Sequence, residues 1–128
     1  YSKFGSYTGN GSADGPFVFT GFRPAFVMIK ASVAPSTTVT GWVMQDSARG
    51  NYNVINAKQL YANRSYQEGL RGDGSSSNPQ RLDIDFLSNG FKLREIGNET
   101  NATGYTYIYA AFAESPSFNL YGGQANAR

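Results

Sequence analysis

Residues 104–114, which read Gly-Tyr-Thr-Tyr-Ile-Tyr-Ala-Ala-Phe-Ala-Glu, constrain the fold more than any other part of the chain. At a two-residue period, the tyrosines share one face with two alanines, while threonine, isoleucine, alanine and phenylalanine share the other. Both faces are largely apolar, so the pattern predicts a strand covered on both sides rather than a half-solvated one. The alanines would also suit a helix, but the tyrosines, threonine and isoleucine lose rotamer freedom in a helix. We therefore expect a central β-strand, in which Ile108→Asp would bury an unpaired charge and unfold the domain.

Short strand-like segments recur along the chain, and no segment has the pattern of a long amphipathic helix. The segments are 3–8, 17–20, 25–30, 41–45, 81–87, 91–96 and 104–114. Asn89-Gly90 predicts a tight hairpin turn between two of them, whereas 51–63 gives a weak signal and 69–80 predicts an exposed loop. This arrangement predicts an all-β single domain, an antiparallel β-sandwich or jelly roll, over residues 1–116, followed by an extension at 117–128.

The composition excludes several classes of function. The chain has 128 residues, enough for one domain, and contains no histidine and no cysteine. A Ser-His-Asp or Cys-His catalytic site and a zinc site with histidine or cysteine ligands are therefore excluded. The net charge is +2 and the charges are scattered, which argues against nucleic acid as a partner, and no apolar run is long enough to insert in a membrane. Because the chain begins with Tyr1, we expect a fragment or a processed product.

Carboxylates provide the few candidates for catalysis or metal binding. Asp83 and Asp85 would lie about 6–7 Å apart on one strand face, within the range of glycosidase carboxylate pairs, and Glu95 is an alternative partner. The alternating polarity favours a solvated strand face instead. Asp73 could bind calcium together with a serine and an asparagine of the same loop, but one aspartate is few for this ion. We expect no enzyme activity, no metal and no cofactor.

Aromatic residues are the main candidates for ligand binding. Trp42 lies between other apolar residues of a strand, which favours burial in the core, although exposed tryptophan can stack on sugar rings. Tyr52, Tyr61 and Tyr66 lie in the least regular part of the sequence. For these tyrosines, exposed contact with a ligand and packing under the loop stay open as equal alternatives.

Arginines and asparagines give weaker signals. Arg49, Arg64 and Arg71 could bind acidic sugars or a partner's carboxylates, or they could be scattered solubilising charges. Four triplets match the N-glycosylation pattern at 10–12, 63–65, 98–100 and 101–103, and chance matches are expected in a chain so rich in asparagine, serine and threonine.

Several segments are distinctive when their order and spacing are taken together. They are 7–11 (Tyr-Thr-Gly-Asn-Gly), 21–30 (Gly-Phe-Arg-Pro-Ala-Phe-Val-Met-Ile-Lys), 42–50, 86–93 (Phe-Leu-Ser-Asn-Gly-Phe-Lys-Leu), 101–114 and the ending Ala-Asn-Ala-Arg. This set resembles a domain found near the C-termini of tailed-bacteriophage virion proteins, among them tail and head fibres. The resemblance implies a non-enzymatic β-sandwich on the virion surface, in multimeric fibres or decorations that are commonly trimeric. Residues 51–80 depart from it.

Three functional hypotheses follow. The first is a phage fibre or a capsid or tail decoration that assembles with copies of itself and other virion proteins, and that binds host-surface glycans through its loops. In it, the tail residues Phe118, Leu120 and Tyr121 could contact a neighbouring subunit. The second is a carbohydrate-binding module of a secreted or surface protein, which would stack sugars on Trp42 or on Tyr52, Tyr61 and Tyr66. The third is a glycan-cleaving enzyme that uses Asp83 with Asp85 or Glu95.

Overall fold

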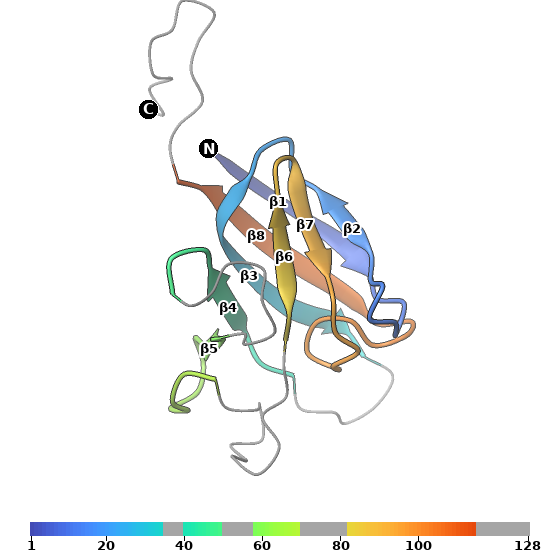
Figure 1. Cartoon of the computed structure of the whole chain (residues 1–128). Helices are drawn as coiled ribbons and strands as arrows, with labels where there is room; N and C mark the ends of the chain where they lie inside the picture. Colours follow the sequence, from blue (N-terminus) through green and yellow to red (C-terminus); the bar gives the residue numbers. More distant parts are fainter. Residues whose placement is uncertain (35–39, 50–57, 70–81, 115–128) are drawn as a thin grey trace, which may run out of the picture.

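The computed structural model describes residues 1–34, 40–49, 58–69 and 82–114, and these residues form two antiparallel sheets without a helix. The strands are β1 (Ser2–Thr8), β2 (Phe17–Phe19), β3 (Pro24–Val33), β4 (Val43–Asp46), β5 (Leu60–Tyr61), β6 (Ile84–Leu87), β7 (Gly90–Leu93) and β8 (Thr106–Ala113). One sheet has the order β1-β8-β3-β4-β5 and the other β2-β7-β6. Figure 1 shows the three-stranded sheet lying across one face of the five-stranded sheet. The predicted antiparallel β-sandwich is confirmed.

Strand β8 lies inside the five-stranded sheet, between β1 and β3. Its pairing with both neighbours covers almost its whole length, and Ile108 lies opposite Ser6 of β1 and Lys30 of β3. The predicted strand at this position is confirmed, and the helical alternative is excluded. Its aromatic and β-branched residues suit the pleated surface of a sheet.

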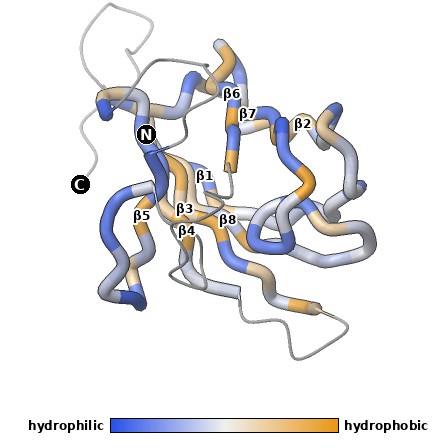
Figure 2. Tube along the Cα trace, turned by 60° about the horizontal axis from the view of Figure 1, so that its bottom comes forward, coloured by the Kyte–Doolittle hydropathy of each residue, from blue (hydrophilic) through white to orange (hydrophobic). Residues whose placement is uncertain are grey.

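The core lies between the inner faces of the two sheets. The largest fully buried side chains from the five-stranded sheet include Tyr107 and Ile29, and those from the other sheet include Phe91 and Leu93. Figure 2 shows the two sheets as separate layers, with β2, β6 and β7 on one side and β1, β3, β4 and β8 on the other. Burying each such side chain stabilises the fold by about 1.5–3 kcal/mol. As predicted, the apolar residues of the alternating segment point inward, namely Leu82, Ile84 and Phe86.

The outer face of β8 differs from the prediction. Ile108 and Phe112 are each 38% exposed, whereas Tyr107 on the inner face is fully buried. The expectation that β8 is covered on both sides is therefore wrong, and so is the expectation that Ile108→Asp would bury a charge. The physical reason is that the three-stranded sheet packs on only one face of the five-stranded sheet.

The predicted hairpin joins β6 to β7. Leu87 lies opposite Gly90, so residues 88 and 89 form the tight turn, and the prediction from Asn89-Gly90 is confirmed. Gly90 has a second role, because a Cβ atom here would meet the carbonyl oxygen of Val18 and lie 3.0 Å from the ring of Phe17. Glycine is thus required for the close approach of β2 to β7.

One end of the sandwich is closed by tyrosine hydroxyls that bind loop backbone. The Tyr107 hydroxyl donates to the carbonyl of Asn98 (2.7 Å) and accepts from the N–H of Ala102 (2.8 Å), and Tyr7 donates to the carbonyl of Thr100 (2.7 Å). Burial raises the pKa of Tyr107 to about 12. Burial, and secondarily the proximity of Tyr107, also holds the pKa of Tyr7 well above its ordinary value.

These raised pKa values predict alkaline unfolding. An unfolded tyrosine titrates near pH 10, so the stabilisation is complete below about pH 10 and is lost as the pH rises through about 12. We expect the free energy of unfolding in urea, measured from about pH 8 to about pH 12, to fall over the upper half of this range. In Tyr107→Phe the free energy of unfolding should fall less steeply with pH, because this variant lacks one of the hydroxyls whose pKa is raised. Equal falls in the two proteins would contradict this prediction.

Candidate functional site

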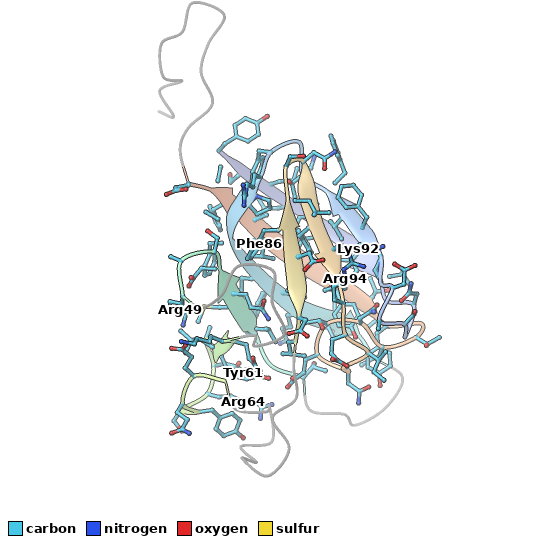
Figure 3. The ribbon with its side chains drawn as sticks, in the orientation of Figure 1. Arg49, Tyr61, Arg64, Phe86, Lys92 and Arg94 are labelled. Atoms are coloured by element: carbon cyan, nitrogen blue, oxygen red, sulfur yellow. The ribbon has the colours of Figure 1, made fainter. Side chains whose placement is uncertain are left out.

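Three of the candidate ligand-binding residues come together at β5 and the turn that follows it. The guanidinium carbon of Arg64 lies 5.4 Å from the ring centre of Tyr66 and 6.0 Å from that of Tyr61. The two tyrosine rings meet edge to face, with their centres 6.0 Å apart. Figure 3 shows Tyr61 and Arg64 together beside β5. The arginine thus forms a cation–π cluster with both tyrosines.

The side chain of Tyr61 packs in the interior of the domain and is not exposed for contact with a ligand. Its side chain is only 5% exposed, and its hydroxyl donates to the carboxylate of the buried Glu99 at 2.6 Å. Tyr66 is half-buried, packs against the cluster formed by Tyr61 with Val43, and its hydroxyl accepts from Arg64 at 3.1 Å. Tyr61 is therefore part of the core and is not available to stack on a sugar ring.

Trp42 is half-buried and belongs to neither core cluster of the described residues. The expectation of core burial is wrong, because the next residue, Val43, takes the inward position and alternation turns Trp42 to the opposite face. The ammonium of Lys30 lies 5.3 Å from the centre of the indole ring. The backbone N–H of Trp42 donates to the side chain of Asn63 at 3.0 Å. A ligand that stacked on this ring would have to compete with Lys30.

Other candidates lie outside the described residues. They are the ligand-binding candidates Tyr52 and Arg71, the interface candidates Phe118, Leu120 and Tyr121, and the calcium-binding candidates Asp73, Ser75 and Asn78. The glycosylation triplet 101–103 is described, and the side chain of Asn101 is fully buried. This asparagine is therefore not an accessible acceptor in the folded chain.

Asp46 and Arg49 form an ion pair inside the chain. The guanidinium Nε lies 2.5 Å from the carboxylate, and the same arginine lies 3.8 Å from Glu68. Burial raises the pKa of Asp46, but the hydrogen bonds from Arg49 and Ala48 outweigh it, so the pKa lies below its ordinary value. Arg49 is thus bound to the chain's own carboxylates.

Ion pairs also cross the outer face of the three-stranded sheet. Arg94 donates to Asp85 at 2.6 Å, and Lys92 lies 2.8 Å from Asp14; Figure 3 shows Lys92 and Arg94 together beside β7. The hydrogen bond from Lys92 lowers the pKa of Asp14. Asp85, one of the two carboxylates considered for catalysis, is therefore held by a guanidinium. Asp83, the other one, is half-buried, and its Oδ1 atom is enclosed by the protein.

The outer face of the five-stranded sheet is the feature that the sequence analysis missed. We call it the outer apolar face, and strand register assigns to it Phe4, Phe26, Met28, Met44, Leu60, Ile108, Ala110 and Phe112. Phe4 is 65% exposed, and its ring meets that of Phe112 edge to face at 5.9 Å. The ring of Phe26 lies 6.0 Å from Phe112 on the other side. Phe4, Ile108 and Phe112 are the exposed members of this face, and the others are half-buried or, in the case of Ala110, buried. Neighbouring exposed apolar side chains of this kind are typical of an interaction site.

The signal for this face was present in the sequence. Segments 25–30 and 104–114 are apolar at both strand parities, which indicates two apolar surfaces but does not say what covers each of them. In the part of the chain that the structure describes, no helix is long and apolar enough to cross a membrane. The same part contains no cluster of three or more acidic side chains able to hold a metal ion.

Comparison with known proteins gives a family but no activity. No curated protein and no solved structure matches the chain. A family described as a domain of unknown function, DUF7483, matches residues 1–116. This match extends over most of the 128 residues. The chain therefore belongs to the DUF7483 family.

Proposed function

We propose that this chain is a non-enzymatic structural domain of a tailed-bacteriophage particle, a fibre or a capsid or tail decoration exposed on the virion surface. The observation that carries the proposal is the outer apolar face, which presents Phe4, Ile108 and Phe112 to solvent from the strands of a well-packed sandwich. A rigid sheet with such a face is suited to contact with other protein subunits. Segments 7–11, 21–30, 86–93 and 101–114 resemble virion domains, and this resemblance is the reason for assigning the domain to a phage particle.

The residue types of the chain and the ion pairs of its carboxylates support a role in binding rather than in catalysis. The chain lacks histidine and cysteine, and the ion pairs Asp46–Arg49, Asp85–Arg94 and Asp14–Lys92 engage carboxylates that could otherwise act as acid or base. A general acid–base pair needs carboxylates that are free to exchange protons with a substrate. These carboxylates instead stabilise the chain's own surface.

The carbohydrate-binding alternative has less support from the geometry. A sugar platform needs exposed aromatic faces, but Tyr61 is buried. Cations lie 5.3 Å from the ring centre of Trp42 and 5.4 Å from that of Tyr66. Contact with host-surface glycans would have to displace these cations or use other loops. Contact with protein through the outer apolar face is the role that the described residues favour.

Mass spectrometry of purified particles tests the proposal. Tailed-phage particles from a source that encodes this chain would be banded by density, and peptides of the chain would be quantified against the known structural proteins. We expect several copies per particle, retained after washing at high salt because apolar contacts are not screened. Peptides confined to the soluble fraction of the lysate would overturn the proposal.

A further inference from the structure

We propose that the outer apolar face binds the same face of a second copy of this chain, so that two five-stranded sheets pack against each other. The inference rests on the proposed structural function and adds the surface and the partner through which it acts. It places self-association on β1, β3, β4, β5 and β8.

An uninterrupted apolar row crosses the whole sheet. Register places Phe4 opposite Ala110, Ala110 opposite Met28, Met28 opposite Met44 and Met44 opposite Leu60, so the row runs through all five strands. No charged or hydrogen-bonding side chain interrupts it. Methionine and phenylalanine are enriched in the centres of protein interfaces, and methionine adapts its shape to a partner. This row forms the centre of the proposed contact.

The two flanking rows add apolar contact on either side of this centre. Phe112 lies between Phe26 and Ser2 in one row, and Ile108 lies between Lys30 and Ser6 in the other. Each flanking row contains one charged residue: Asp46 lies opposite Phe26 in the first row, and Lys30 lies opposite Ile108 in the second. Charges at the margin of an apolar centre are the usual arrangement of protein interfaces.

The outer face of the other sheet provides an internal comparison. Register places Phe17 opposite Lys92 and Lys92 opposite Asp85 there, and Lys92 and Arg94 form ion pairs across it. Phe17 is 45% exposed, and Phe19 is 61% exposed, nearly as much as Phe4. Phe19 belongs to the next row of this face, which continues through Gly90 to Leu87. The outer face of the three-stranded sheet therefore mixes charged and apolar side chains, whereas the central row of the outer apolar face carries no charge.

A second copy is the occupant that fits the face best. An isologous pair matches each surface with an equal surface of the same chemistry, so the apolar row meets an apolar row and needs no complementary charge. With strands about 4.8 Å apart and about 3.4 Å per residue, the face measures about 20 Å by about 24 Å. Two such faces would bury about 1,000 Å² in total, which is below the roughly 1,200–2,000 Å² of stable interfaces and in the range of weak, transient ones. They would pack about 10 Å apart, as sheets do. We therefore expect a reversible, concentration-dependent dimer.

Sedimentation equilibrium on the full chain tests the inference with matched variants. Phe4→Lys and Phe112→Lys each place a charge in the proposed contact, and Phe19→Lys is the control, because it changes a phenylalanine of similar exposure on the other sheet. From about 1 µM to about 1 mM, the range of weak affinities, the unmodified chain should approach twice the monomer mass. Both contact variants should weaken the dimer at least about tenfold, with thermal midpoints close to that of the control, and the control should dimerise as the unmodified chain does.

Three outcomes would overturn the inference. The first is a chain that stays monomeric over the whole range, and the second is a control that weakens association as much as Phe4→Lys and Phe112→Lys do. The third is a mass that settles at three copies, because two flat faces pair only two chains. A monomer that is found in particles would overturn this inference alone, and a dimer that is absent from particles would overturn the proposed function alone.

Discussion

Ile29→Asp is expected to prevent folding, whereas Ile108→Asp is expected to leave a folded domain. Ile29 is fully buried on the inner face of β3, opposite Tyr109 and Val43. An unpaired carboxylate there costs several kcal/mol, a large part of the roughly 5–15 kcal/mol that stabilises a domain. The same carboxylate at Ile108 lies on the outer face, reaches water and has Lys30 beside it in register, so its cost should be about 1 kcal/mol or less.

The comparison needs far-UV circular dichroism and urea unfolding at low protein concentration, where the monomer prevails. We expect no cooperative transition for Ile29→Asp and a transition close to that of the unmodified chain for Ile108→Asp. Unfolding of both variants would mean that both faces of β8 are buried, and it would contradict the assignment of an outer apolar face.

Asn101→Asp should cause the second largest loss of stability among the changes considered. The Asn101 side chain is fully buried, and its amide donates to the carbonyls of Ser12 (2.7 Å) and Glu95 (2.9 Å), while its oxygen accepts from the N–H of Asn10 (2.9 Å). The substitution removes two donors and places a carboxylate against two carbonyl oxygens. We expect it to cost about 2–4 kcal/mol, since each buried group left unpaired costs about 1–3 kcal/mol.

Asn98→Asp is the matched control for this change, because Asn98 is exposed and lies three residues away on the same loop. Its free energy of unfolding should stay within about 0.5 kcal/mol of the unmodified chain. The loss in Asn101→Asp should shrink on acidification, which protonates the new carboxylate. Equal stabilities for Asn101→Asp and Asn98→Asp would show that Asn101 does not join the loops at 9–15 and 95–101.

The sequence predicted those elements whose signals are local. Alternation placed Ile84 and Phe86 inward, and Asn89-Gly90 placed the hairpin, because a two-residue period and a tight turn are properties of adjacent residues. For Leu60 and Tyr61 the sequence left a short strand and a helical turn open, because strand β5 has only two residues and depends on its pairing with β4. Such a short strand is stabilised by its neighbour and has no pattern of its own.

The candidate site was harder to predict because its contacts are distant in sequence. Tyr61 is buried, and its hydroxyl donates a hydrogen bond to Glu99, which lies 38 positions away in the sequence. No pattern among neighbouring residues could predict that contact. Phe4 lies among small and polar residues of β1, so its place in an apolar row depends on register with Ala110 across most of the chain. Periodicity shows that a face is apolar, but only the packing of the sheets shows which face is left exposed.

Hydroxyl-radical footprinting of assembled particles tests the central claim most directly, namely that this domain works through contact on the outer apolar face. The oxidation rates of Phe4, Phe112 and Phe19 would be compared between the isolated chain at low concentration and the particle. We predict that Phe4 and Phe112 become protected in the particle, while Phe19, which is nearly as exposed as Phe4 in the isolated chain, keeps its rate. Protection of Phe19 with unchanged oxidation of Phe4 and Phe112 would contradict the account.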